Sequence, residues 1–300
     1  MTTAALRVAT RGSVLARWQA ERVIELLGVP GDLVIVSTRG DQRSDAPIHS
    51  IGGTGVFVKE VERAVLDGRA DVAVHSAKDL PSTTRAGLVL AAFPERGDPR
   101  DALVGAAIDD IPTGGRVGTG SVRRRAQLAN VRPDLTFGEL RGNIPTRLDR
   151  ASAFDAVVVA AAALDRLGLA GRISERLSPG TVLPQVGQGA LAVECRAVDA
   201  RALDLVAAID DADTSAAVTA ERAYLARLGG GCSLPCGALA RVTPDGTVEL
   251  EALLASLDGR IALRLRGTGR DPEALGARVA GELLEEHGGR VLVDDLGVVA

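Results

Sequence analysis

The sequence of 300 residues has few aromatic side chains, few cysteines and only two lysines, Lys59 and Lys78. Aromatic residues make up 2% of the chain, too few for the stacking surfaces that bind single-stranded nucleic acids. Three cysteines are too few for a disulfide framework, and three scattered histidines do not form a zinc motif. We therefore expect no metal site and a reducing, cytoplasmic setting.

Long hydrophobic runs are also lacking. No stretch of about 18 apolar residues occurs, and the N-terminus has no apolar core behind a basic start, so we expect neither a membrane span nor an export signal. A net charge of −4 argues against bulk nucleic-acid binding. The apolar fraction of 46% is that of an ordinary globular protein, and the length predicts two or three domains.

Strand and helix signals alternate along the first hundred residues. Short apolar runs predict strands, and spaced apolar residues after Ser13 and after the glycine-rich turn at 52–55 predict helices. The first of these helices is expected to end at Gly28. This alternation is typical of a parallel sheet covered by helices. The predicted strands are 6–9, 33–36 and 72–74.

A second unit of the same kind follows a polar segment at 95–101, which we interpret as a hinge. Its predicted elements are a strand at Val117, a helix from Ser121, and strands at 136–140, 155–160 and 190–195. After residue 213 the pattern changes and predicts an antiparallel sheet between two helices. Those elements are a helix at 215–228, strands at 247–256 and 259–267, and a helix at 274–286.

The segment VHSAKDLPS at 74–82 follows a predicted strand directly, and in open α/β sheets ligands bind just beyond the carboxyl ends of strands. It brings Ser76, Lys78 and Asp79 together. A carboxylate beside a lysine can stay ionised, accept a hydrogen bond from a substrate N–H and stabilise positive charge that develops there. The alternative interpretation is a polar surface turn with a Lys–Asp pair.

Arginines are concentrated between residues 116 and 150, where eight arginines and three acidic residues give a local net charge of +5. Arg123 and Arg124 follow a GTGS turn at an expected helix N-terminus, where backbone N–H groups favour anions. Because guanidinium groups bind carboxylate or phosphate at two points, a polyanionic small molecule is the expected ligand. A dinucleotide fingerprint is a weak alternative, since its third glycine would fall at Arg123. Three arginines are interpreted as solvated surface: Arg116, Arg132 and Arg150.

A third motif, GGGCSLPCG at 229–237, places Cys232 directly after three glycines. Glycines let the backbone approach a bound group closely, which favours a reactive or modified thiol at this position. Cys195 lies in an apolar predicted strand and Cys236 begins an apolar run, so both are interpreted as small buried side chains.

Seven motifs occur in order over nearly the whole chain: ATRGS at 9–13, GVFVKE at 55–60, VHSAKDLPS at 74–82, GTGSVRRRAQL at 118–128, LRGNIPTRL at 140–148, VGQGAL at 186–191 and GGCSLPCGA at 230–238. Together they resemble the porphobilinogen deaminase family, also called hydroxymethylbilane synthases. The resemblance implies a transferase that joins four porphobilinogen molecules head to tail, releasing ammonia each time, to give hydroxymethylbilane. It also implies a dipyrromethane primer bound covalently through Cys232.

The resemblance assigns roles to individual residues. Asp79 would be the catalytic residue, which hydrogen-bonds pyrrole N–H groups and stabilises the electron-poor pyrrole formed when ammonia leaves. The carboxylates of substrate and cofactor would be bound by Arg11, Ser13, Ser76, Lys78, Thr119, Ser121, Arg123, Arg124, Arg141, Arg147 and Gln188. Further candidates are Lys59, Phe57 and Gly189.

The resemblance further implies a cytoplasmic monomer with no nucleic-acid or membrane partner. The expected fold class is α/β, with two domains like periplasmic binding proteins and a small α+β C-terminal domain with an antiparallel sheet. Domain one would comprise 1–94 and 189–210, domain two 100–184, and domain three, which carries the cysteine loop, 213–300.

Some positions depart from the family motifs. Thr54 stands where many relatives have lysine, so a charge contact is missing there or is supplied by another residue. Ala77 replaces a common methionine, which we interpret as a packing difference; Gly120, Pro145 and Cys236 also differ. Two other functions stay open: a non-catalytic anion-binding protein of the same two-lobed fold, and an enzyme that forms a Schiff base through Lys78.

Overall fold

The computed structural model describes residues 5–38, 58–229 and 234–295, and the chain divides into two compact units. The first unit is Met1–Gly97 with Ala190–Ser215, and the second is Asp98–Gly189 with Ala216–Ala300. The chain therefore passes between the units three times, and neither unit is a continuous stretch of sequence.

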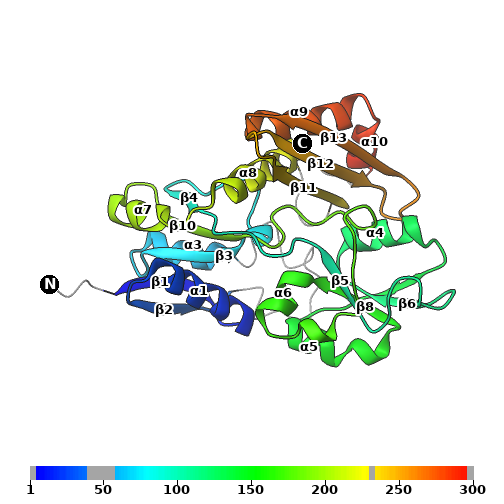
Figure 1. Ribbon diagram of the computed structural model, residues 1–300, viewed down its shortest axis with the longest axis horizontal. Coiled ribbons are helices and arrows are strands. Elements are labelled where there is room, and N and C mark those ends of the chain that lie inside the picture. The colour runs from blue at the N-terminus through cyan, green and yellow to red at the C-terminus, as the bar shows by residue number, and fades with distance from the viewer. Residues whose placement is uncertain (1–4, 39–57, 230–233, 296–300) are drawn as a thin grey trace. The chain divides into compact units, whose positions relative to one another are not determined.

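The first unit is built on a five-stranded sheet. In spatial order its strands are β2 (Gly31–Val36), β1 (Leu6–Arg11), β3 (Val72–Ser76), β10 (Leu191–Arg196) and β4 (Leu88–Ala92) (Figure 1). β1 runs parallel to β2 and β3, as the alternating pattern predicts. β10 runs antiparallel to β3 and β4, so the sheet is mixed and the prediction of a wholly parallel sheet was wrong. β10 enters from the second unit, not through a helical crossover from a neighbouring strand, and a parallel direction is therefore not imposed on it.

Helices cover both faces of this sheet. On one face α1 (Val14–Leu27) and α7 (Ala200–Ala207) pack on a core that includes Val72 and Val74 of β3. On the other face α3 (Lys59–Leu66) packs on Ala73. Because side chains alternate along β3, its odd-numbered residues point toward α3. The Ser13 hydroxyl accepts a hydrogen bond from the Ala16 N–H and Gly28 ends α1 with φ +62°, so both predicted ends of the helix are confirmed.

The second unit contains a similar five-stranded sheet. In spatial order its strands are β7 (Thr136–Gly138), β6 (Arg116–Gly118), β8 (Ala156–Ala160), β5 (Asp101–Val104) and β9 (Glu175–Arg176). β6 is parallel to β7 and β8, whereas β5 is antiparallel to β8 and β9. α4 (Val122–Val131) covers the face that contains Leu103, and α5 (Ile144–Asp149) and α6 (Ala161–Arg166) cover the face that contains Ala102. The first residue of β5, Asp101, therefore lies on the α4 side of its strand.

The same unit holds a three-stranded antiparallel sheet of β11 (Cys236–Val242), β12 (Val248–Ala255) and β13 (Ala262–Gly269). Its core is shared with α8 (Ala212–Arg227), α9 (Pro272–Glu285) and α10 (Gly289–Asp294) (Figure 1). The buried Tyr224 hydroxyl donates a hydrogen bond to the Leu253 carbonyl oxygen at 2.9 Å. A Cβ at Gly276 would lie 2.1 Å from the Ala220 carbonyl oxygen, so glycine permits the close approach of α9 to α8.

The predicted fold class is confirmed: two mixed α/β sheets and a C-terminal antiparallel sheet with helices. Several elements lacked a sequence prediction, namely β4, β5, β9, β11, α5, α6, α7 and α10. Apart from β11 and α7 these are of six residues or fewer, too short for a period of apolar residues to stand out. Within the described ranges no helix is both long and apolar enough to cross a membrane.

Candidate active site

The first group of predicted site residues lies at one edge of the first unit's sheet. β1 and β3 are parallel neighbours, so their carboxyl ends meet at the same edge. Arg11 ends β1, Ser76 ends β3, and Asp79 lies in the single 3₁₀ turn Ala77–Asp79 that follows. A cavity of about 60 Å³ is lined there by Arg11, Ser13, Ser76 and Asp79. Residues that are distant in sequence are thus brought together as predicted.

Gln19 belongs to this group, although it was not among the predicted site residues. Its side chain is buried on α1, and its amide nitrogen lies 2.9 Å from the Ser76 hydroxyl, which it holds in place. Gln19 also lines the cavity. Its signal in the sequence is a polar residue on the apolar face of a helix, and such a residue needs a buried partner.

The remaining predicted residues of this unit are less close to the cavity. Lys78 lies in the 3₁₀ turn beside Asp79, and Lys59 is the first residue of α3. Among the described residues, neither lysine lines the cavity. Phe57 and Thr54 lie outside the described residues, as does Cys232.

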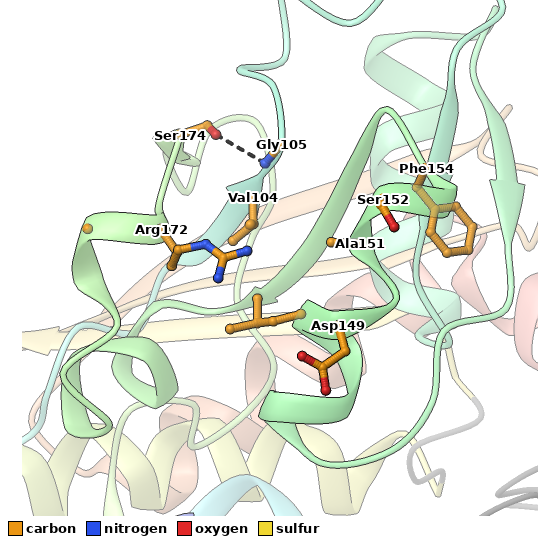
Figure 2. Close-up of a pocket in the computed structure, with 10 residues that line it drawn as sticks. Val104, Gly105, Asp149, Ala151, Ser152, Phe154, Arg172 and Ser174 are labelled. Carbon is orange, nitrogen blue, oxygen red and sulfur yellow. Dashed lines mark hydrogen bonds between the residues drawn. The ribbon is translucent and has the colours of Figure 1, made fainter.

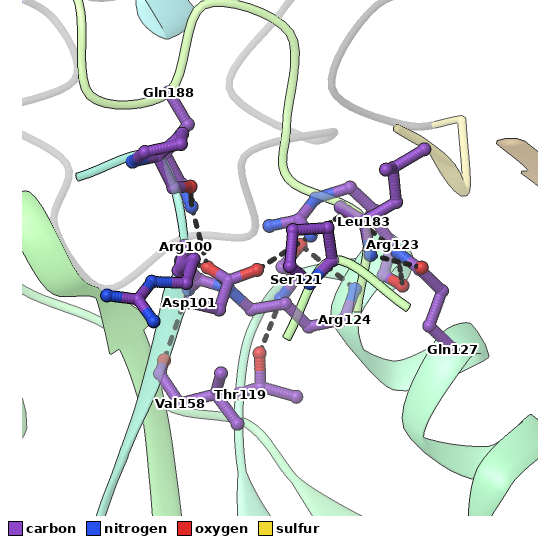
Figure 3. A network of polar contacts seen from close by, with 12 residues as sticks. Arg100, Asp101, Thr119, Ser121, Arg123, Arg124, Gln127, Val158, Leu183 and Gln188 are labelled. Carbon is purple, nitrogen blue, oxygen red and sulfur yellow. Dashed lines mark hydrogen bonds and ion pairs between the residues drawn. The ribbon is translucent and has the colours of Figure 1, made fainter. Parts of the chain in front are cut away.

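The second group surrounds the N-terminus of α4 in the second unit. The helix begins where it was predicted, and Ser121 caps it by accepting a hydrogen bond from the Arg124 N–H. The next turn places the side chains of Arg123 and Arg124 against Asp101 of β5 (Figure 3). Arg123 Nη1 donates to Asp101 Oδ2 at 2.8 Å, and Arg124 donates to Asp101 Oδ1 through Nε at 2.9 Å and Nη2 at 2.7 Å. All three side chains are buried, so the paired arginines do not lie on a solvated surface.

The charge of this group is unbalanced. Burial by itself would raise the pKa of the Asp101 carboxyl, but Arg123 and Arg124 outweigh burial and hold that pKa well below its ordinary value. One carboxylate therefore faces two guanidinium groups, which leaves a net charge of +1. Within the described part of the chain, Nε and Nη2 of Arg123 are buried without a hydrogen-bond partner. These two nitrogens form one edge of the guanidinium, the edge that binds a carboxylate at two points.

Gln188 contacts the arginine pair indirectly, through a hydrogen bond to the Asp101 carboxylate. Its side-chain nitrogen donates to Asp101 Oδ1 at 2.9 Å and to the Pro99 carbonyl oxygen at 2.8 Å (Figure 3). Gln127 similarly fixes Leu183, whose carbonyl oxygen accepts a second hydrogen bond from Arg123 Nη1 at 2.7 Å. The structure thus places Gln188 against the carboxylate that orients the arginines.

Of the other predicted residues of the second unit, Thr119 lies beside the same helix end, Arg141 precedes α5, Arg147 lies on α5 and Gly189 precedes β10. Thr119 is buried and its hydroxyl accepts a hydrogen bond from the Ser121 N–H at 3.2 Å. Arg141 and Arg147 are half-buried; Arg141 Nε lies 3.4 Å from Glu139, and Arg147 Nε donates to the Gly142 carbonyl oxygen at 2.8 Å. The Gly189 carbonyl oxygen accepts a hydrogen bond from Arg166, whose pKa is lowered to about 10 by burial.

A larger pocket elsewhere in the second unit contains none of the predicted residues. Its volume is about 480 Å³, and Figure 2 shows Asp149, Phe154 and Arg172 around it. Most of its lining is exposed, which is typical of a surface depression. Size alone therefore does not identify the site in this protein.

Asp101 is the residue that sequence reasoning missed most clearly. In the sequence it is the last residue of the polar hinge ERGDPRD, where an acidic residue is unremarkable. Its partners are 22, 23 and 87 positions away, so its role is visible only in the folded chain.

Comparisons with known proteins show the family to which the chain belongs. The family model described as "Porphobilinogen deaminase, dipyromethane cofactor binding domain" matches residues 6–204, and that described as "Porphobilinogen deaminase, C-terminal domain" matches residues 215–285. The chain belongs to the porphobilinogen deaminase family, and the resemblance seen in the seven motifs is confirmed.

Similar proteins include porphobilinogen deaminases from two bacteria. That of Syntrophotalea carbinolica is 46% identical over 304 residues, which cover 97% of this chain and 96% of the relative. That of a Roseiflexus species is 48% identical over 299 residues, which cover 96% and 98%. Among solved structures, a Salmonella typhimurium periplasmic binding protein with high arginine specificity aligns at 14% identity over 69% of this chain and 92% of its own, with a TM-score of 0.39. That score is too low to carry an argument.

Proposed function

We propose that the protein is a hydroxymethylbilane synthase: a transferase of tetrapyrrole biosynthesis that joins four porphobilinogen molecules head to tail, with release of ammonia. The observation that carries the proposal is the unpaired Nε–Nη2 edge of Arg123 in a buried group of net charge +1. Each porphobilinogen bears an acetate and a propionate. A carboxylate bound at this edge would pair both nitrogens and balance the charge, whereas leaving a buried donor unpaired costs about 1–3 kcal/mol.

Other polar residues within each unit are further proposed contacts for carboxylates. In the proposal the carboxylates of substrate and cofactor are bound by Arg11, Ser13, Ser76, Lys78, Thr119, Ser121, Arg123, Arg124, Arg141 and Arg147, with Lys59, Phe57 and Gly189 as further contacts. Gln188 acts through Asp101, to which it donates a hydrogen bond. A growing chain gains two carboxylates with each unit, which is why a site with many arginines suits it better than a single clamp.

Asp79 is the proposed catalytic residue. When the C–N bond of porphobilinogen breaks, the electron pair leaves with the nitrogen as ammonia, and the pyrrole becomes electron-poor. The Asp79 carboxylate, at the cavity lined by Arg11 and Ser76, accepts a hydrogen bond from the pyrrole N–H and stabilises the positive charge. It holds the ring while the free α-carbon of the growing chain forms the new carbon–carbon bond to it and then loses its own proton.

The part of the chain that matches the dipyrromethane-binding family model includes Asp101 and both arginines. The unpaired edge of Arg123 fits a group that carries carboxylates, and we propose that Arg123, Arg124 and Ser121 hold this group in the second unit. When bound, dipyrromethane supplies the pyrrole carbon to which the first substrate unit is joined. Cys232, outside the described residues, is the proposed point of attachment, because a thiolate is a strong nucleophile toward an electron-poor pyrrole.

Three further properties belong to the proposal. The domains are 1–94 with 189–210, 100–184, and 213–300, the last carrying Cys232. The enzyme is a monomer, and it acts in the cytoplasm without nucleic-acid or membrane partners. Gel filtration with light scattering tests the oligomeric state, and a mass of twice 30.9 kDa would refute the monomer.

Intact-protein mass spectrometry tests the attachment and the function together. We expect the purified chain to exceed its polypeptide mass by two pyrrole units, and Cys232→Ser to have the bare mass and no hydroxymethylbilane synthesis. Cys236→Ser, at the start of β11, is the matched control and should keep the adduct. A wild-type protein of bare mass that binds porphobilinogen without releasing ammonia would instead be a binding protein. Borohydride trapping of substrate on Lys78 would contradict the role of Asp79.

A further inference from the structure

Three ionisable side chains are buried at the proposed active site, where one of them, His75, also lines the cavity, and none has a part in the chemistry described above. His75 of β3, Glu194 of β10 and Glu62 of α3 have side chains that are 4%, 1% and 5% exposed. They lie between the sheet and α3, on the face opposite Val74 and Val193. Charged groups are almost never buried without partners, so their positions require a physical explanation.

The contact between His75 and Glu194 defines one of these partnerships. His75 Nε2 lies 3.4 Å from Glu194 Oε2, and within the described residues neither atom has a hydrogen-bond partner. An imidazole nitrogen that carries a proton is a donor, and a carboxylate oxygen is an acceptor. A proton on Nε2 satisfies both atoms, whereas a bare Nε2 would set two lone pairs against each other.

Glu62 belongs to the same cluster but contacts a different partner. Burial raises the pKa of Glu62, and the charge of Glu194 raises it further; His75, Arg85 and Lys59 act in the opposite direction but do not outweigh these effects. Arg85 Nη1 lies 3.7 Å from Glu62 Oε2, and its side chain is 45% exposed, so water screens its charge. Glu62 thus faces Arg85, whereas the carboxylate that contacts His75 is that of Glu194.

His75 directly precedes the residues proposed to act on substrate. Ser76, on the other face of β3, is held by Gln19 at 2.9 Å, and the turn that carries Asp79 begins at Ala77. The end of β3 is thus fixed from both faces: by α1 through Gln19, and by β10 through Glu194. A shift of this strand end would move Ser76 and Asp79 together.

We propose that His75 is a positioning residue, which holds the end of β3 through an Nε2–H directed at Glu194 and thereby sets the place of the Asp79 carboxylate. The inference depends on the proposed function, since it assigns Asp79 a role in turnover. Its two parts can be tested separately, by the position of the proton and by the kinetics of variants.

The kinetic test replaces His75 by glutamine or by asparagine, whose side-chain amides mimic different nitrogens of the imidazole ring. The amide nitrogen of His75→Gln reaches the place of Nε2, whereas that of His75→Asn reaches only the place of Nδ1. We expect His75→Asn to lower kcat about 10-fold to 10²-fold with little change in KM, because a misplaced catalytic group slows the chemical step. His75→Gln should retain most activity, and His287→Gln, at an exposed position, is the control. Equal activity of the Asn and Gln variants would overturn the proposal.

The carboxylates give a second comparison. Glu62→Gln should leave kcat nearly unchanged because Glu62 faces Arg85, whereas Glu194→Gln removes the carboxylate that lies 3.4 Å from His75 Nε2 and should lower kcat. Equal losses in the two variants would refute the assignment of Glu194 as the partner of His75.

The position of the proton is tested in the wild-type protein by ¹⁵N NMR of labelled histidine at neutral pH. The chain has three histidines, so His49→Gln and His287→Gln assign the His75 signals by elimination. We expect a proton on Nε2, and an Nε2 without a proton would overturn the inference even if every His75 variant failed to fold. A wild-type protein without deaminase activity would refute the proposed function and leave this result intact.

Discussion

Replacement of Asp101 by asparagine gives the most direct test of the buried arginine group. The substitution nearly preserves the shape of the side chain and removes its charge, so Arg123 and Arg124 face each other in the interior without a counter-charge. Breaking a buried pair by removing one partner costs about 3–5 kcal/mol. The asparagine NH₂ would in addition oppose one or more of the four donors that now converge on the carboxylate from Arg123, Arg124 and Gln188.

Thermal and denaturant unfolding would measure this cost. At roughly 2–4 °C per kcal/mol, Asp101→Asn should lower Tm by about 6–20 °C. The control is Glu249→Gln, which breaks the 2.7 Å pair of Arg241 and Glu249, whose side chains are 79% and 37% exposed. Exposed pairs contribute about 0–1 kcal/mol, so the control should change Tm little. Equal effects of the two substitutions would refute the argument that burial makes the Asp101 group costly to break.

The effect of Asp101→Asn on the free energy of unfolding should depend on pH, in a direction set by the lowered pKa of Asp101. The pKa of Asp101 is lower in the folded protein than in the unfolded chain, so its contribution to stability is complete above the unfolded value of about 3.9 and is lost as pH falls through the folded value. The difference in unfolding free energy between wild type and Asp101→Asn should therefore be constant from pH about 8 to 5 and shrink below about 4. A difference that grows on acidification would contradict the assigned direction.

Three further substitutions test other parts of the site. Asp79→Asn should lower turnover by at least about 10² while substrate still binds, and the exposed Asp149→Asn should not; normal turnover in the Asp79 variant would exclude its role. Arg123→Lys keeps the charge but loses the unpaired edge, so KM should rise about 10-fold or more, against no change for Arg132→Lys; equal KM values would refute carboxylate binding at that edge. Glu221→Gln places an NH₂ opposite either the Gly187 N–H or the Ala240 N–H, both of which now donate to the carboxylate. The free energy of unfolding, measured by chemical denaturation, should fall by about 1–3 kcal/mol, and an unchanged free energy would show that neither contact stabilises the fold.

Local signals predicted much of the fold. The hydroxyl of Ser13, the left-handed Gly28 and the helix start at Ser121 depend on a few neighbouring residues of the chain, and all three lie where the sequence places them. The direction of β10 depends on where the chain comes from, not on its own residues. A run such as ALAVEC is equally compatible with both directions, so the mixed character of the sheet was not predictable from it.

For the site, residue types were easier to predict than their surroundings. The grouping of Arg11, Ser76 and Asp79 follows from parallel strands that end at one edge, which the alternating pattern contains. Arg123 and Arg124 were selected as ligands without any indication that they are buried. Burial depends on Asp101, which neutralises one of the two charges, and no rule of spacing connects a hinge residue with a helix 22 positions away.

The place of β10 in the first unit's sheet has a consequence for the order in which the protein is made. β4 lies at the edge of that sheet, beside β10, and the ribosome releases β10 roughly a hundred residues after β4, about 5–20 s later at ordinary rates of synthesis. During this interval the nascent chain has β1, β2 and β3 but lacks the strand that joins β4 to them. The sheet that carries Arg11, Ser76 and Asp79 is therefore completed only after the residues of Asp98–Gly189 have been synthesised, so a nascent chain that ends at Gly189 should be recognised by chaperones as unfinished.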